Sequence, residues 1–445
     1  MKRWMMALIS FLTALICAGC AESALTPGKV GTFTKESAPA LMSSMPKPQG
    51  MTLNFFGVEN GFLTSGDVGY TIREHEPYSG FVYLHYFDFI HMEGGVLCRR
   101  AGCAHAGAGC GAAVPRGYIT RLLPSEEGVW LLCQFTQYEA FCAPTAVYVE
   151  YIDYVTGART MYPRLNNGGA GLSSALWPVM VTDGRMLFVD APAEDGWSGA
   201  VCLDLSTGEQ TQYESSRRST LVAGCKQGLL CMRGPLEGEG RIPPLPGGWE
   251  LFLQPYDGAE PRTLATWEGM CRKVFYWEDF CYLVESSSEG QACSVERVDI
   301  TAGTSEPFAQ IPCRRGGHAQ CFEGVYDGKL VWSEALGTAD HQEPETARYA
   351  LDLQTGEVFA CLLPVRNDST QTASIHAESR EWFVICTAVE LRRMGGYGTD
   401  GMLHVQERPV PVYSLIRKED YWSNIPEYVE SAPLQEFADA QIFCS

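Results

Sequence analysis

The chain has 445 residues, of which 33 are lysine or arginine and 53 are aspartate or glutamate, so its formal net charge at pH 7 is −20. A surface this acidic repels nucleic acid and anionic lipid headgroups, which excludes both as expected partners of the folded body. The hydrophobic fraction of 46% is ordinary for a globular protein, and the length suffices for a large core or a repeat array.

The N-terminus predicts an exported protein that carries a lipid. A basic start is followed by an apolar stretch over residues 4–18, which is too short to span a bilayer comfortably. The next residues, Gly19 and Cys20, complete a sequence that resembles the bacterial lipobox, in which the cysteine after the cut site is lipidated; Cys17 departs from the leucine usual in that motif. We expect a signal peptide over residues 1–19 and a lipid on Cys20 that anchors the chain to the outer face of the cell membrane; the alternative is a plain secretory signal.

Residues 20–50 are small, polar and dotted with proline, and no hydrophobic period runs through them. This composition predicts a disordered, flexible tether behind the lipidated cysteine. We then expect the folded body over residues 51–430 and a C-terminal tail over residues 431–445.

A tight-turn pattern recurs through the body about every fifty residues. In each copy an aspartate is followed four residues later by a glycine, at residues 153–157, 204–208, 299–303 and 352–356, with a degenerate copy at residues 257–258. The aspartate side chain can cap such a turn while the glycine takes a positive φ, so each copy predicts a hairpin turn between two strands.

A second pattern lies upstream in each unit, where a turn precedes a strongly apolar strand, as at residues 127–132, 183–189, 227–232 and 327–332. Four short antiparallel strands repeated about every 40 to 50 residues predict an all-β fold, a single β-propeller of seven four-stranded blades, with six or eight blades as the alternative counts. The blades are expected at residues 51–98, 116–165, 173–215, 218–268, 269–313, 318–365 and 371–430. Two packed β-sandwich domains are the alternative, but one repeat through the whole body favours one ring.

A cysteine and histidine knot follows the first blade: Cys98, Cys103, His105 and Cys110. Three thiols and an imidazole in so short a segment can close on a tetrahedral metal such as a structural zinc ion. The alternative is one disulfide with a spare cysteine, because spacing alone decides neither connectivity nor metal. We expect the knot to connect an outer strand to the next inner strand, with its four side chains gathered on the loop face of the ring.

The chain has 18 cysteines, and most of the others lie singly inside apolar, strand-like runs, as Cys202, Cys231, Cys281 and Cys386 do. This placement predicts cysteine used as a small buried hydrophobe rather than as a disulfide partner.

The knot, the repeated turns and the segment at residues 416–428 together resemble lipid-anchored propeller proteins of Gram-positive, often anaerobic, bacteria. The resemblance covers nearly the whole mature chain. It implies a propeller fold and an extracytoplasmic address, and it implies no catalytic residue.

The sequence lacks a serine-hydrolase nucleophile elbow, a P-loop, a dinucleotide-binding glycine pattern and a zinc-protease motif. The loops between second and third strands carry the remaining candidate binding residues: Glu194, Asp195, Trp197, Trp249, Arg392, Arg393 and Tyr397. Two functions follow as hypotheses. The first is a non-catalytic surface module that binds a protein, peptide or glycan through this loop face. The second is a glycan-active hydrolase or lyase with a carboxylate pair in the central channel.

Overall fold

The structure is a computed structural model. It describes residues 63–73, 81–98, 102–107, 109–115, 118–124, 128–135, 146–153, 158–162, 180–182, 186–192, 198–212, 219–234, 248–269, 271–285, 292–312, 320–336, 345–397 and 403–439. The predicted signal peptide, Cys20 and the predicted tether lie outside these residues. No helix in the described part of the chain is both long enough and apolar enough to cross a bilayer.

The described strands form successive, mainly antiparallel sheets, and within each sheet the first three strands follow one another in chain order. The first two sheets are β1 (Leu63–Ser65), β2 (Val68–Arg73), β3 (Phe81–Asp88), β4 (Glu93–Val96) with β5 (Ala113–Pro115), and β6 (Tyr118–Pro124), β7 (Gly128–Phe135), β8 (Ala146–Asp153), β9 (Arg159–Met161). The next two are β10 (Met180–Thr182), β11 (Met186–Pro192), β12 (Ser198–Asp204), β13 (Gln210–Gln212), and β14 (Thr220–Cys225), β15 (Gly228–Arg233), β16 (Trp249–Pro255), β17 (Arg262–Trp267).

The remaining sheets lie in the C-terminal half. They are β18 (Lys273–Trp277), β19 (Phe280–Glu285), β20 (Ala292–Asp299), β21 (Thr304–Pro312); β22 (Gln320–Tyr326), β23 (Lys329–Leu336), β24 (Glu345–Asp352), β25 (Val358–Cys361), β26 (Pro364–Val365), β27 (Asp368–Thr372); and β28 (Ile375–Glu378), β29 (Trp382–Tyr397), β30 (Leu403–Arg417). Two short helices follow, α2 (Lys418–Trp422) and α3 (Ala432–Asp439).

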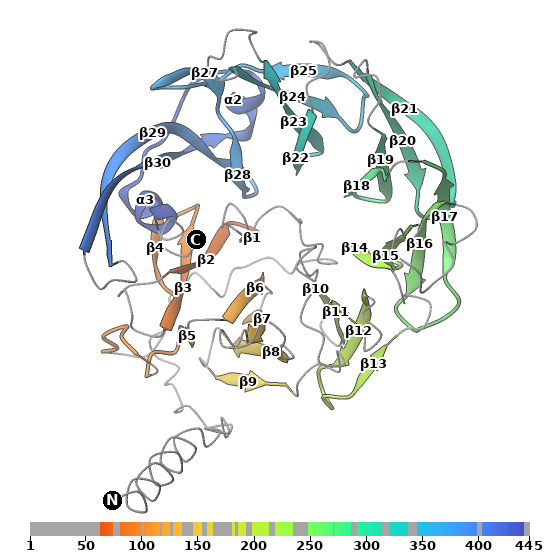
Figure 1. Cartoon of the computed structure of the whole chain (residues 1–445), viewed down its shortest axis with the longest axis horizontal. Helices are drawn as coiled ribbons and strands as arrows, with labels where there is room; N and C mark the ends of the chain where they lie inside the picture. The colour runs from red at the N-terminus through yellow and green to blue at the C-terminus, as the bar shows by residue number, and fades with distance from the viewer. Residues whose placement is uncertain are drawn as a thin grey trace, which may run out of the picture.

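Figure 1 shows the sheets arranged as a ring, which is the predicted β-propeller. Among the described strands, six sheets contain a four-stranded meander and form six blades. The sheet of β28, β29 and β30 has three strands and lies between the last blade and the first. The prediction of seven four-stranded blades is therefore wrong at the C-terminal end, because β30 is followed by α2 instead of an outer strand.

The recurrent turns have the predicted geometry wherever the structure describes them. The Oδ1 atoms of Asp204, Asp299 and Asp352 each accept bonds of 2.8–3.1 Å from the backbone N–H groups two and three residues ahead. The closing glycines have φ angles of 74°, 68° and 80°, a region that an L side chain rarely adopts. The turn at residues 153–157 lies largely outside the described residues.

The same turns join neighbouring blades through the carbonyl of the residue after the aspartate. Tyr162 donates its hydroxyl to the Leu205 carbonyl at 3.1 Å, and Tyr282 donates to the Leu353 carbonyl at 3.0 Å. Arg262 donates to the Ile300 carbonyl in the same manner. Burial raises the pKa of Tyr282 to about 12, so its hydroxyl remains a proton donor at neutral pH. Each of these three turns therefore accepts a hydrogen bond from the blade before it.

The core lies between sheets, where apolar side chains of neighbouring blades meet. One cluster joins Val284 and Val295 with Trp332 and Leu351 of the next blade. Among the described cysteines, those predicted to be small hydrophobes are buried and form no disulfide: Cys202, Cys231, Cys281 and Cys386.

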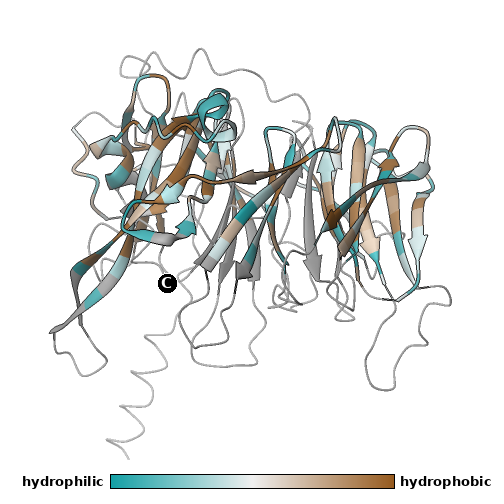
Figure 2. Cartoon of the chain, turned by 90° about the horizontal axis from the view of Figure 1, so that it is seen from above, coloured by the Kyte–Doolittle hydropathy of each residue, from teal (hydrophilic) through white to brown (hydrophobic). Residues whose placement is uncertain are grey.

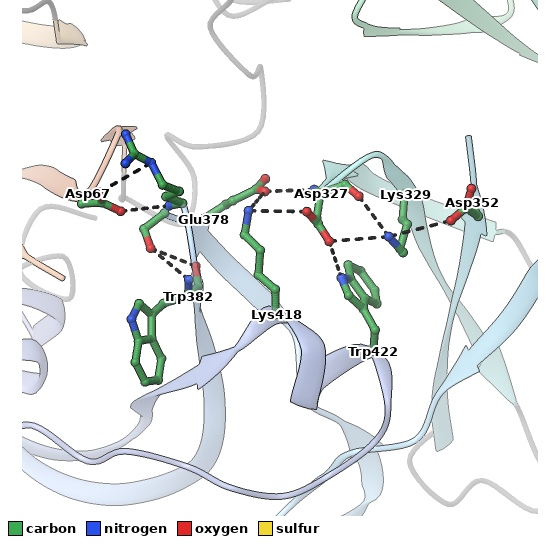
Figure 3. Close-up of polar contacts among 10 residues, drawn as sticks. Asp67, Asp327, Lys329, Asp352, Glu378, Trp382, Lys418 and Trp422 are labelled. Atoms are coloured by element: carbon green, nitrogen blue, oxygen red, sulfur yellow. Dashed lines mark hydrogen bonds and ion pairs between the residues drawn. The ribbon is translucent and has the colours of Figure 1, made fainter. Parts of the chain in front are cut away.

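A polar network joins the three-stranded sheet to the blades on both sides (Figure 3). Lys418 lies 2.5 Å from Glu378 and 3.7 Å from Asp327, which belongs to the β22–β23 turn. Burial raises the pKa of Glu378, and the Lys418 cation opposes this shift. On the other side, the backbone N–H of Arg380 donates to Asp67 at 3.1 Å. The ring is therefore closed by ion pairs and hydrogen bonds as well as by apolar contact.

The segment predicted as a C-terminal tail contains α3. Leu434 of this helix is fully buried in a cluster with Phe87 and Phe89 of the first blade and Tyr413 of β30. The helix thus fills the junction at which the ring closes.

Replacing Asp352 with alanine is expected to lower the free energy of unfolding by about 1 kcal/mol, because two backbone N–H groups lose their acceptor. Burial acts to raise the pKa of Asp352, but the N–H groups of Thr355 and Gln354 and the Lys329 cation bring it below its usual value. The carboxylate therefore stabilises the fold above the unfolded-state pKa, and this contribution is lost as pH falls through the lowered folded-state value.

Urea unfolding of the unmodified protein and of Asp352→Ala, at neutral and at acidic pH, measures the difference in their free energies of unfolding. Glu357→Ala in the same turn is the control, since only the backbone of Glu357 bonds there, and it should change stability by less than about 0.5 kcal/mol. An Asp352→Ala defect that stays constant down to strongly acidic pH would contradict the assignment.

Candidate metal centre

The knot is an excursion from the outer strand of the first blade. Strand β4 pairs with the C-terminal half of β3, and β5 pairs with the N-terminal half of the same strand. Leu84 in β3 joins the two halves, since its carbonyl accepts from Leu97 at 2.8 Å and its N–H donates to Ala112 at 3.0 Å. The outer strand therefore stops at β4, leaves the sheet through the knot and resumes as β5.

This placement corrects one prediction. The knot was expected as the connector between two blades, on the loop face of the ring. It instead leaves the outer strand partway along its length, because β5 returns to the same ladder before the chain crosses to β6.

The structure brings the four predicted side chains together. The ligand atoms of Cys98, Cys103, His105 and Cys110 all lie within 4.8 Å of one another. The Cys110 Sγ atom is 3.7 Å from the His105 Nδ1 atom. A tetrahedral zinc ion with Zn–S near 2.3 Å and Zn–N near 2.05 Å separates sulfur from nitrogen by about 3.6 Å and two sulfurs by about 3.8 Å. The donors are therefore already near the spacing that a tetrahedral ion requires.

Positive φ angles allow the loop to fold back on itself. Gly102, His105 and Gly107 have φ angles of 70°, 51° and 64°. Glycine adopts this region freely, but His105 does so at a cost of order 1–3 kcal/mol, which other contacts must offset. The Gly107 N–H donates to the Tyr83 hydroxyl at 2.7 Å, so a residue of β3 holds the tip of the loop against the sheet.

Backbone N–H groups approach two of the sulfur atoms. The His105 N–H lies 3.4 Å from Cys103 Sγ, and the Ala112 N–H lies 3.4 Å from Cys110 Sγ. Such donors stabilise a thiolate and orient a metal ligand. Without a cation, the pKa of Cys110 lies far above its ordinary value. The largest cause is the hydrogen bond with Cys98, followed by burial and by the charges of Cys98 and Cys103, while the Ala112 N–H lowers the pKa.

The donor set fits a metal ion. The three cysteines form no disulfide, and Cys110 is only 1% exposed, within the apolar cluster of the first blade. Three sulfur donors and one imidazole are typical of zinc and of iron in thiolate sites, and they match neither calcium nor magnesium. The cluster could therefore hold a metal ion, and four protein ligands would complete its tetrahedron.

The other predicted site residues are not brought together with the knot. Glu194, Asp195 and Trp197 lie outside the described residues. Trp249 begins β16, stacks on Trp267 with ring centroids 6.4 Å apart and donates its Nε1–H to the Gly269 carbonyl at 3.1 Å. Its ring packs within its own blade.

The remaining candidates were expected in a loop, and they lie in strand β29. Arg392 pairs with Glu390 at 3.2 Å. Arg393 and Tyr397 are paired in register with Glu407 and Leu403 of β30.

Sequence reasoning missed the residues that support the knot. Leu84 and Tyr83 belong to an ordinary apolar strand, and nothing in the local sequence marks them as holding a loop more than ten residues away. Arg159 was also missed, although it contacts the strand that follows the knot. Their roles depend on strand pairing, which the local pattern does not contain.

No protein-family model matches the chain, and no curated protein matches it. The resemblance to lipid-anchored propeller proteins therefore remains an expectation, and the β-propeller fold is what the strand pairing establishes.

Solved structures include distant likenesses. A puromycin hydrolase mutant is 12% identical with a TM-score of 0.42, over 87% of this chain and 61% of that one. Dipeptidyl peptidase 4 from Porphyromonas gingivalis is 10% identical with a TM-score of 0.40, over 90% and 62%. The β-propeller domain of the Trilobed protease from Pyrococcus furiosus is 13% identical with a TM-score of 0.38, over 69% and 80%. The chain spans about three fifths of the first two proteins, and these scores carry no argument about function.

Proposed function

We propose that this chain is a non-catalytic binding module, anchored by a lipid on Cys20 to the outer face of the cell membrane, that takes an extended segment of a partner protein. The observation that carries the proposal is the hairpin of β29 and β30. These strands have 16 and 15 residues, whereas the second and third strands of the six blades have 6 to 8. Figure 2 shows the hairpin reaching past the neighbouring sheets.

The two outer edges of this hairpin differ. Pro409 and Pro411 remain in the ladder opposite Leu391 and Val389, so the N–H groups that they lack belong to the outer edge of β30. Proline at such positions blocks a further strand from pairing. The outer edge of β30 is therefore closed to strand addition at Pro409 and Pro411, and farther along Leu415 already pairs there with Val429.

The outer edge of β29 has no such block. The Val389 N–H donates outward to the Asn367 side chain at 2.9 Å, and the Asn367 amide donates to the Val389 carbonyl. Because outward groups alternate along an antiparallel strand, the next outward N–H groups belong to Leu391, Arg393 and Gly395. Among the described strands, β29 beyond this point pairs only with β30. Leu391 is 71% exposed beside this edge. Such an edge suits β-strand addition by an extended peptide.

The enzyme alternative, a glycan-active carboxylate pair, gains no support from the described residues. Glu150 lies 2.6 Å from Arg159, Glu323 lies 2.8 Å from Arg348, and Glu378 lies 2.5 Å from Lys418. Each of these three carboxylates forms an ion pair with a cation, so none of them is left open to act on a glycan.

A proline at position 393 tests the proposal. Its missing N–H would face outward, as those of Pro409 and Pro411 do, so the hairpin ladder should survive while the edge loses a donor. Arg393→Ala removes the same side chain and keeps the N–H, which makes it the matched control. Partners cross-linked to the lipidated protein on intact cells are captured and quantified for each variant.

We expect Arg393→Pro to reduce the captured partner at least tenfold and Arg393→Ala to reduce it less than about threefold. Equal capture by both variants would show that the edge is not used. Turnover of cell-surface glycans by the purified protein would favour the enzyme alternative instead.

The anchor rests on Cys20, whose thiol alone can carry the lipid in the mature N-terminus. Cys20→Ser is expected to move the protein from the detergent phase to the aqueous phase in a membrane partition. Retention of the serine variant in the detergent phase would contradict the anchor.

We also propose that the knot holds a structural zinc ion. Four protein ligands leave no open position for a substrate, which separates this site from catalytic zinc. The mature chain, purified without oxygen, should contain one zinc per molecule. Cys103→Ser should lose it, and Cys271→Ser should retain it because Cys271 is an exposed thiol outside the knot. Absence of stoichiometric metal, or a disulfide between two knot cysteines, would contradict the zinc site.

A further inference from the structure

We propose that the metal ion of the knot latches the first blade to the second blade through β5. The inference rests on the zinc site proposed above and assigns that site a partner within the fold. It is carried by the contacts of β5, the short strand that begins where the knot ends.

Strand β5 depends on the knot for its position. It has three residues, and it pairs with β3 only at Phe81, Val82 and Tyr83. The Ala113 N–H donates back to the Cys110 carbonyl at 3.2 Å, and the Ala112 N–H lies against Cys110 Sγ. A strand this short has little stability alone, so fixing Cys110 on a metal ion fixes the start of β5.

The other side of β5 contacts the second blade. Arg159 of β9 donates to the Ala113 carbonyl, and the same guanidinium holds Glu150 at 2.6 and 2.8 Å. The side chains of this ion pair are 14% and 8% exposed, so solvent screens them little. The second blade therefore places an arginine on the backbone of β5.

An apolar cluster runs across the same junction. It contains Cys110, Ala112 and Val114 from the first blade together with Val129 and Leu131 from the second, all of them buried. A ligand of the proposed ion therefore belongs to the apolar cluster that spans the two blades. Because packed interiors hold few voids, movement of Cys110 is expected to disturb this cluster.

Loss of the ion should release this junction. Leu97 and Ala112, on the two sides of the knot, both bond to the backbone of a single residue, Leu84. Bound metal divides this excursion into short closed loops, and its removal returns their conformational entropy. We expect β5 to detach from Arg159 while the remaining blades keep their own ladders.

Hydrogen exchange of the full mature chain, with zinc bound and after chelation, tests the latch. Amides of β5 and of β8–β9 should exchange at least about tenfold faster without metal, and those of β20–β21 across the ring should not change. Metal content is measured on the same samples. If the chain contains one zinc ion but chelation leaves hydrogen exchange at β8–β9 unchanged, the latch is overturned and the zinc site still stands. A chain with no zinc would instead overturn the site.

A variant of Arg159 removes the contact between the second blade and β5 without changing a metal ligand. Arg159→Ala leaves all four ligands in place, so we expect one zinc per chain, fast exchange at β8–β9, and loss of the response to chelation. Arg297→Ala is the matched control, because Arg297 pairs with Glu306 inside a distant blade. Arg159→Ala with a normal response to chelation would contradict the role of this arginine. Chelation of the unmodified chain provides the test that does not depend on the variant folding.

Discussion

The structure depends on one constraint: a four-stranded sheet in this chain cannot bury both of its faces alone. Each blade is stable only between two neighbours, so the ring must close for any blade to be covered. The recurrent turn meets this need directly. Its aspartate shapes the turn, its glycine takes the positive φ, and the carbonyl between them accepts a hydrogen bond from the preceding blade, as Leu353 does from Tyr282. One local motif therefore forms both the hairpin and the joint.

The sequence predicted the parts of the fold that local chemistry decides. Turns such as that of Asp352 follow from a side-chain acceptor and a glycine four residues apart, and the buried cysteines follow from their apolar neighbours. The last sheet was not predictable in this way. Residues after β30 continue as α2, whose Tyr421 is buried in the core and donates its hydroxyl to the Ala373 carbonyl. That choice depends on packing between distant segments.

The candidate metal site also combines features that the local sequence predicts with features that depend on distant segments. The composition of the knot predicted that three thiols and an imidazole would converge, because they lie close together in the chain. Its position inside an outer strand was missed, because only the pairing of Leu84 with both Leu97 and Ala112 reveals it. Arg392, Arg393 and Tyr397 were expected in a loop between the second and third strands of a blade, and they lie in β29. Pairing with β30 over fifteen positions overrides the local preference.

Two features depart from the repeated four-stranded blade, and they lie in neighbouring sheets. The knot belongs to the first blade and the long hairpin to the last sheet, and these two neighbours meet where the ring closes (Figure 1). Helix α3 lies between them, with Leu434 against Phe87 of the first blade and Tyr413 of β30. A closing junction has no covalent continuity between its strands, so it is the weakest point of a ring and needs added contacts. The first blade, which carries the knot, and the sheet that carries the long hairpin therefore lie on the two sides of the junction that α3 fills.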